Sequence, residues 1–141
     1  MATRKKLRKL SPKTLVKRFE TNPDSFERWL KKQGFVFIGS GAFSMVFSHK
    51  KVNYVVKIGA GEYEIPRGKY YLKPLHVVNG GDGMMIQPKC ESVYNGCDED
   101  TDEYQYWRGI VEKLASKCVS WCDDHCGNVG IYKGQPVIID W

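Results

Sequence analysis

Short apolar runs separated by turn-forming residues dominate the first two thirds of the chain. Residues 35–38, 45–48 and 54–58 are mostly apolar, with many β-branched and aromatic side chains. Residues 75–78 and 84–87 repeat this pattern on either side of the turn sequence Asn-Gly-Gly-Asp-Gly. Strands that follow one another through short turns usually pair as antiparallel meanders and hairpins. The pattern therefore predicts five strands in an antiparallel sheet.

A helical pattern precedes these strands. Ser11 and Asn22 are each followed by a proline, which places a capping side chain before a residue suited to the first helical position. Apolar side chains in helical spacing follow each cap. The sequence therefore predicts two short helices within residues 12–33, the second of which ends at Gly34.

The clearest helix signal lies in the second half of the chain. Between Tyr104 and Trp121, apolar residues recur every three or four positions over roughly five turns. Asp100 and Glu103 have the spacing of a capping box and place negative charge at the start of this helix. Residues 129–132 and 137–139 flank a Lys-Gly-Gln-Pro sequence, which predicts a small terminal hairpin.

Residues 59–74 resist assignment because glycine and proline interrupt them repeatedly, so at most a very short helix fits there. The expected fold is thus α+β. Residues 1–33 would form a basic helical extension, residues 34–88 the antiparallel sheet, and residues 89–141 the long helix and hairpin.

Composition narrows the class of protein. A chain of 141 residues suffices for one hydrophobic core, and no apolar run approaches the roughly 18 residues of a membrane span. An odd number of cysteines without a CxxC pair favours free thiols in a reducing cytoplasm over a disulfide framework. A zinc site formed by Cys118, Cys122, His125 and Cys126 is the alternative to buried free thiols.

The net charge of +6 is concentrated at the N-terminus, because residues 1–19 contain only basic charges. Such a segment is suited to contact nucleic acid or an acidic protein surface. A solvated tail followed by one polar helix face is the simpler interpretation. No aromatic side chain is interleaved with the charges before Phe19, so base stacking is not favoured.

A glycine pair lies at the turn between the first two predicted strands. Glycine has no Cβ, so the backbone of a Gly-x-Gly turn can approach a phosphate closely, although ordinary hairpins also use such pairs. A dinucleotide-binding loop leads into a helix, whereas this loop leads into a strand, as in protein kinases. The candidate phosphate-binding residues are Gly39, Ser40, Gly41, Ala42, Phe43 and Ser44.

Lys57 lies in the third predicted strand. Strand alternation places it away from the core, so simple exposure to solvent is one interpretation. The other is that its ammonium group binds the α- and β-phosphates of a nucleotide. A helix glutamate pairs with this lysine in kinases, and Glu62 and Glu64 are the nearby candidates.

Polar residues that suit phosphoryl transfer follow the long predicted helix. Asp123 and Asn128 lie five residues apart, and Asp140 follows the last apolar strand. Magnesium prefers oxygen ligands, which makes Asn128 and Asp140 the candidate metal ligands. Asp123 would orient or deprotonate the acceptor hydroxyl, and its spacing to the asparagine favours it over Asp124. His125 is expected to brace this loop by hydrogen bonds, and an ordinary Asp/Asn/Gly turn is the alternative for the whole segment.

Three blocks resemble the early-expressed serine/threonine protein kinases of podophages. Residues 37–49, 55–59 and 123–128 are similar to the family's G-x-G-x-F-S-x-x-Y-S-H loop, I-K-V-G strand and D-x-H-S-G-N loop. The resemblance implies a minimal kinase-like fold, with an N-lobe at residues 34–88 and a reduced helical C-lobe at residues 89–141. It also implies ATP and Mg²⁺ as cofactors and phosphorylation of host proteins in the bacterial cytoplasm.

By matching position, the resemblance assigns phosphate binding to Lys57, the catalytic base to Asp123, and the magnesium ligands to Asn128 and Asp140. The chain departs from the family where the glutamate-bearing helix belongs, and Trp141 replaces the start of the usual glycine-containing motif. A minimal or truncated kinase core is therefore expected. A host partner, a second chain or a homodimer would complete its peptide site.

Two other functions stay open. An inactive kinase-like protein would bind and inhibit a host enzyme or defence factor through its surface. A small-molecule phosphotransferase would use the same Asp/Asn/Asp chemistry, although the substrate lobe is small. The joint presence of the lysine, the two aspartates and the asparagine favours an enzyme, because a pure binding protein has no physical need for that set.

Overall fold

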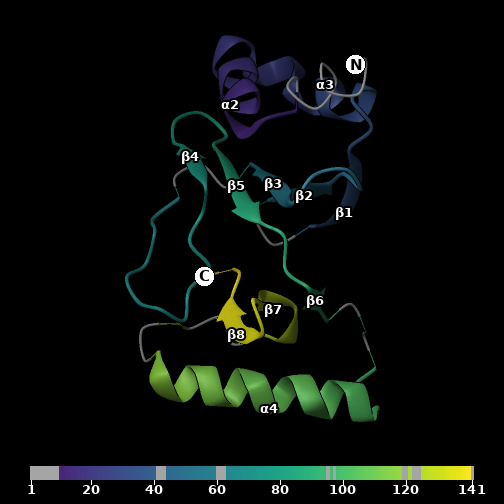
Figure 1. Cartoon of the computed structure of the whole chain (residues 1–141), viewed down its shortest axis with the longest axis vertical. Helices are drawn as coiled ribbons and strands as arrows, with labels where there is room; N and C mark the ends of the chain where they lie inside the picture. Colours follow the sequence, from purple (N-terminus) through teal and green to yellow (C-terminus); the bar gives the residue numbers. More distant parts are fainter. Residues whose placement is uncertain are drawn as a thin grey trace. The chain divides into compact units, whose positions relative to one another are not determined.

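A computed structural model of the chain describes residues 10–40, 44–59, 63–94, 96, 98–118, 121 and 125–140 (Figure 1). The chain divides into two compact units. Residues 1–65 and 73–88 form the first unit, and residues 66–72 and 89–141 form the second.

The first unit is built on a five-stranded antiparallel sheet with the order β1-β2-β3-β5-β4 (Figure 1). The strands are β1 (Val36–Ser40), β2 (Met45–Ser48), β3 (Tyr54–Ile58), β4 (His76–Val78) and β5 (Met84–Pro88). The predicted five-stranded antiparallel sheet and the α+β class are confirmed. The meander β1-β2-β3 and the hairpin β4-β5 are local pairings, which explains why short-range patterns located them.

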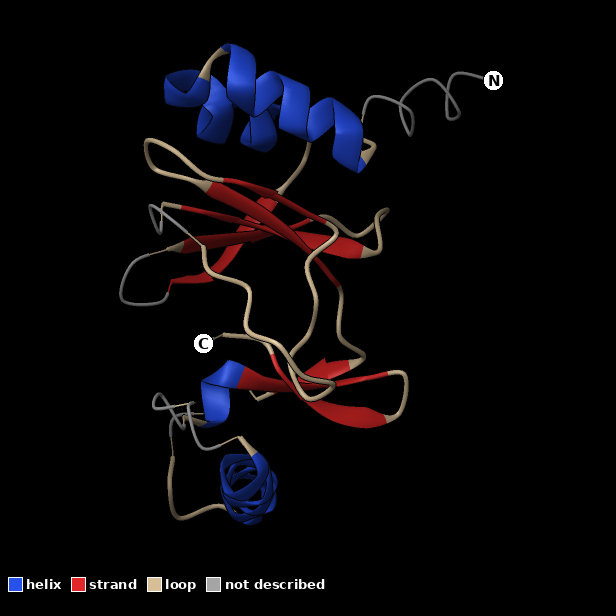
Figure 2. Cartoon of the chain, turned by 90° about the vertical axis from the view of Figure 1, so that its left-hand side faces the viewer, coloured by secondary structure: helices blue, strands red, loops and turns tan. Residues whose placement is uncertain are grey.

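Two helices cover one face of this sheet, α2 (Pro12–Thr21) and α3 (Phe26–Lys32), joined by the short 3₁₀ helix η1 (Pro23–Ser25) (Figure 2). The predicted caps are confirmed, since Ser11 Oγ accepts the N–H of Thr14 at 3.3 Å and Asn22 Oδ1 accepts that of Ser25 at 3.3 Å. The chain leaves α3 through Gly34, whose φ of +96° favours glycine. No helix in the described parts of the chain is long and apolar enough to cross a membrane.

The helices and the sheet share one hydrophobic core. Leu15, Phe26 and Leu30 from the helices are fully buried, as are Phe47 and Val56 from the sheet. The residues just before α2 are held against this core, because the hydroxyl of Tyr54 donates a hydrogen bond to the backbone carbonyl of Leu10. Burial raises the pKa of the Tyr54 phenol, which therefore stays protonated and keeps this bond at neutral pH. The helices of the predicted N-terminal extension thus pack into the same core as the sheet.

Cross-strand register divides the sheet residues between two faces, because directly paired residues point to the same side. The row beneath the helices consists of Phe47, Val56, Ile86 and His76. The neighbouring row, on the opposite face, consists of Val46, Lys57, Met85 and Val77.

The second unit packs α4 (Asp102–Lys117) with a three-stranded antiparallel sheet of order β6-β7-β8. The strands are β6 (Ser92–Val93), β7 (Val129–Tyr132) and β8 (Gln135–Ile138). The predicted terminal hairpin is confirmed. Its two-residue turn, Lys133-Gly134, has φ values of 51° and 77°, as type I′ turns require. Trp107, Val111 and Leu114 of α4 share a core with the hairpin.

The long helix differs from its prediction at both ends. Thr101 is the N-cap in place of Asp100, and its Oγ1 accepts the N–H of Tyr104 at 3.1 Å. At the other end Cys118 caps the helix, and Trp121 lies beyond it. Trp121 nevertheless belongs to the same core, so its periodic position reflects burial of the segment after the helix. Strand β6 was not predicted, because two residues carry too short a pattern.

Two glycines of the second unit provide a matched test of packing. A Cβ at Gly130 would lie 2.9 Å from Cys90 Sγ and 3.2 Å from the Ser92 carbonyl oxygen. A Cβ at Gly109 in α4 would meet no described atom within 4 Å. We expect Gly130→Ala to lower the free energy of unfolding by about 1–3 kcal/mol. Gly109→Ala should raise it by up to about 1 kcal/mol. Urea denaturation measures both, and a stabilised Gly130→Ala variant would contradict the close approach of Cys90 to β7.

Candidate functional site

Lys57 lies in the middle of β3, on the sheet face opposite the helices. Its side chain is only 5% exposed, so the interpretation of Lys57 as a simple surface lysine is wrong. Its neighbours in the same cross-strand row are Val46 and Met85, and Met85 is 2% exposed. An ammonium group is retained in such surroundings only where its charge is compensated. The fold therefore holds Lys57 in a fixed, largely dehydrated position.

The first glycine of the predicted loop, Gly39, lies in the same cross-strand row as Lys57. Gly39 pairs with Val46, which in turn pairs with Lys57, so the three residues lie in one row across β1, β2 and β3. Adjacent strands are about 4.8 Å apart, which puts the Gly39 backbone about 10 Å from that of Lys57. A Cβ at Gly39 would meet no described atom within 4 Å, so packing does not account for this glycine.

The remaining loop positions are only partly described. Ser40 ends β1, and Ser44 directly precedes β2. Gly41, Ala42 and Phe43, which were predicted to contact phosphate, lie outside the described residues.

Val46 and Met85 flank Lys57 and were not predicted as site residues. Their apolar side chains share its row, in which Val46 is partly exposed and Met85 is buried. A signal for Val46 was present, because it occupies the last position of the G-x-G-x-x-G-x-V pattern. Met85 carries no such signal, since the pairing of β3 with β5 depends on tertiary structure.

The structure brings the two predicted magnesium ligands together. The carbonyl oxygen of Asn128 accepts the N–H of Ile139 at 2.8 Å and that of Asp140 at 3.3 Å. These bonds continue the β7-β8 ladder past its last pair, Val129 with Ile138. Asn128 and Asp140, twelve residues apart in sequence, are thus neighbours at the open end of the hairpin. Both are partly exposed, so solvent and a ligand can reach them.

Hydrogen bonds fix the backbone around this pair. His125 Nδ1 accepts the N–H of Gly127 at 2.9 Å, and the His125 carbonyl accepts that of Asn128 at 2.9 Å. The prediction that His125 braces the loop is confirmed. The indole N–H of Trp121 donates to the Asp140 carbonyl at 3.3 Å. The segment after α4 therefore holds the end of the chain that carries Asp140.

An amide oxygen and a carboxylate are hard ligands that fit Mg²⁺. Asn128 and Asp140 supply only two protein ligands, so magnesium would also require phosphate oxygens and water molecules. No cluster of three or more His, Cys, Asp or Glu side chains suited to a metal occurs among the described residues. The pair therefore suits a metal that arrives with a phosphorylated ligand better than a permanent structural metal.

Two described cysteines of the second unit are core residues. Cys118 and Cys126 are free and buried in the core beside α4, as the free-thiol interpretation predicted for them. Burial raises the pKa of the Cys126 thiol, while the nearby Arg108 lowers it in part. Cys126 thus stays protonated at neutral pH. Cys122, the third cysteine of the zinc alternative, lies outside the described residues.

Several predicted positions are not placed. Asp123, the predicted base, and its rival Asp124 lie outside the described residues, as does Glu62. Glu64 is exposed in a segment without regular structure, and residues 63–74 contain no helix. Lys57 belongs to the first unit, and Asn128 and Asp140 belong to the second.

No known protein family, curated protein or solved structure matches the chain in comparisons. The positions and contacts of these residues are therefore the basis for a functional assignment.

Proposed function

We propose that this chain is a minimal, phage-encoded serine/threonine protein kinase that transfers the γ-phosphate of ATP to host proteins. The observation that supports the proposal is the backbone adjacency of Asn128 and Asp140, the two residues for which the kinase-like sequence order predicts magnesium binding.

The first unit supports the proposal through its strand arrangement. In protein kinases a glycine-rich loop joins the first two strands, and the phosphate-binding lysine lies on the third. Here Gly39, the residue before the last of β1, lies in the same cross-strand row as Lys57 on β3, and Lys57 is buried. A buried ammonium group beside apolar Val46 and Met85 matches a nucleotide, which combines charged phosphates with a flat base.

The proposed reaction assigns a role to each candidate residue. The acceptor hydroxyl oxygen attacks the γ-phosphorus, the bond from that phosphorus to the β–γ bridging oxygen breaks, and ADP leaves. Lys57 holds the α- and β-phosphates, and Asp123 accepts the proton of the hydroxyl. Asn128 and Asp140 would hold magnesium, which supplies charge neutralisation at the phosphate oxygens.

One observation favours the second candidate, a kinase-like protein that binds and inhibits a host protein. Strand β1 is an edge strand of the sheet, and Val36, Phe37 and Ile38 are each more than half exposed. Exposed apolar edge strands readily pair with other chains. A binding protein would use this edge, whereas a kinase would use it only to position a protein substrate.

Transfer of labelled phosphate separates the two candidates. The protein is incubated with γ-³²P-ATP, with Mg²⁺ or EDTA, and with or without a bacterial lysate. We expect magnesium-dependent label on serine and threonine, identified by phosphoamino-acid analysis. Absence of transfer, together with no thermal shift on addition of ATP and Mg²⁺, would reject the kinase and leave the inhibitory role.

A further inference from the structure

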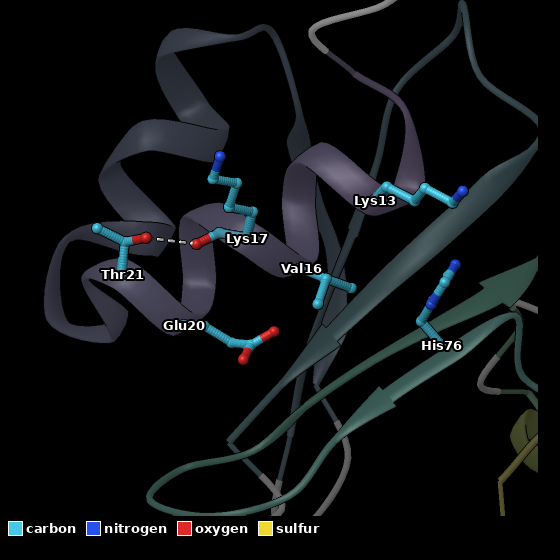
Figure 3. Close-up of a pocket in the computed structure, with 6 residues that line it drawn as sticks. All are labelled: Lys13, Val16, Lys17, Glu20, Thr21 and His76. Atoms are coloured by element: carbon cyan, nitrogen blue, oxygen red, sulfur yellow. Dashed lines mark hydrogen bonds between the residues drawn. The ribbon is translucent and has the colours of Figure 1, made fainter.

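A polar cavity lies in the first unit, between α2 and the edge strand β4 (Figure 3). Its volume is about 360 Å³, and its lining consists of Lys13, Val16, Lys17, Glu20, Thr21 and His76. The first five residues occupy successive turns of α2, and His76 is the first residue of β4. In Figure 3 Lys13 and His76 lie at one end of the cavity, and Glu20 and Thr21 lie at the other.

This cavity is separate from the candidate nucleotide site. His76 pairs with Ile86, whose side chain belongs to the core beneath the helices. Lys57 pairs with Met85, the next residue along β5, and so points to the opposite face of the sheet. The kinase proposal therefore explains nothing about the residues of this cavity.

The charged groups around the cavity are not engaged with one another. Among the described residues, the side chains of Lys13, Glu20 and His76 form no ion pair or hydrogen bond. Lys13 and Glu20 are seven residues apart, which corresponds to about 10 Å along the helix axis. They are thus too far apart for direct pairing along α2. Lys13 lies at one end of the cavity and Glu20 at the other, and Lys17 is about one turn before Glu20 in the same lining.

We propose that this cavity binds a small ligand with a phosphate group at one end and an ammonium or hydroxyl donor at the other. Lys13, assisted by His76, is suited to the phosphate, because lysine ammonium groups bind phosphate oxygens as point charges. Glu20 accepts the hydrogen bond of the donor group, and Val16 supplies an apolar floor between the two ends. An amino-sugar phosphate is the chemical class with these features.

The volume favours a small molecule over nucleic acid. About 360 Å³ falls at the lower end of the range for small-molecule sites and accommodates a monosaccharide phosphate. A nucleic-acid backbone would require a continuous basic surface, whereas Glu20 places a negative charge inside this cavity and would repel a second phosphate.

Glucosamine 6-phosphate is a suitable probe, titrated into the ¹⁵N-labelled full chain with the amide signals of α2 and β4 followed by NMR. We expect saturable shifts at Lys13, Val16, Lys17 and His76. Lys13→Glu should weaken the affinity by about fivefold to tenfold, whereas Lys50→Glu, the same charge change in an exposed turn, should leave it unchanged. His76→Gln provides a second variant that is less disturbing to α2.

Glu20→Gln gives a test of sign. It should lower the affinity for glucosamine 6-phosphate, because the ammonium group of this probe loses the Glu20 carboxylate as its partner. It should raise the affinity for inorganic phosphate, because the phosphate loses a repulsive negative neighbour. The proposal is overturned if no saturable shift appears at the cavity, if Lys50→Glu weakens binding as much as Lys13→Glu, or if glucosamine without phosphate binds equally well. It is also overturned if a short oligonucleotide binds the same residues more tightly. None of these outcomes depends on whether phosphate transfer from ATP occurs.

Discussion

Replacing Lys57 with methionine is expected to abolish phosphate transfer and to leave the protein folded. Methionine has a similar length and no charge, so the variant removes the ammonium group and little volume. Loss of a preorganised cationic contact to the phosphates should lower the transfer rate by at least about 100-fold. Stability should fall to some extent, because Lys57 is 5% exposed and loss of its charge leaves the group that compensates it without a partner.

The transfer rate from γ-³²P-ATP and the thermal midpoint are the two measurements. Lys50→Met is the matched control, because Lys50 is exposed between β2 and β3 and should change neither quantity. If Lys57→Met does not fold, Lys57→Arg keeps the charge but not the compact ammonium and should still lose most activity. Full activity in a folded Lys57→Met protein would show that Lys57 has a structural role only.

The second large effect is expected from Asp140→Asn. This change removes one negative charge from the proposed magnesium pair and keeps the size of the side chain. The contacts of Asp140 with Asn128 and Trp121 use backbone atoms, so the hairpin end should remain intact. The transfer rate at low Mg²⁺ should fall by about 100-fold, with a partial recovery at high Mg²⁺ because the metal affinity is lowered.

A magnesium titration of the transfer rate measures this effect. Asp100→Asn is the control, since it removes the same charge from an exposed position before α4. Equal magnesium dependence in the wild-type, Asp140→Asn and Asp100→Asn proteins would mean that Asp140 does not bind the metal. Asn128 would then have a structural role in the loop and would not share a metal with Asp140.

Local patterns predicted most of the fold. Strands β2, β3 and β7 occupy their predicted residues, because alternation and turn residues are read within a few positions. The helix caps Ser11 and Asn22 were likewise recognisable from their neighbours. The end of α4 was not, since Trp121 keeps helical spacing through its place in the core although the helix has already ended.

The hairpin explains why one half of the site could be predicted. With a two-residue turn at 133–134, residues equally distant from the turn face each other, so Asn128 lies opposite Ile139 and next to Asp140. Spacing alone contains that information. The burial of Lys57 does not follow from spacing, because it depends on residues far along the chain, such as Met85 in β5.

The central claim is that the Asn128–Asp140 pair would bind the metal of a nucleotide–metal complex. Paramagnetic broadening by Mn²⁺–ATP in the NMR spectrum of the ¹⁵N-labelled protein tests it most directly, because Mn²⁺ broadens signals close to the metal. The claim predicts broadening at Asn128 and Asp140 that excess Mg²⁺–ATP reverses. No broadening at these two residues, or broadening at the α2–β4 cavity alone, would contradict it.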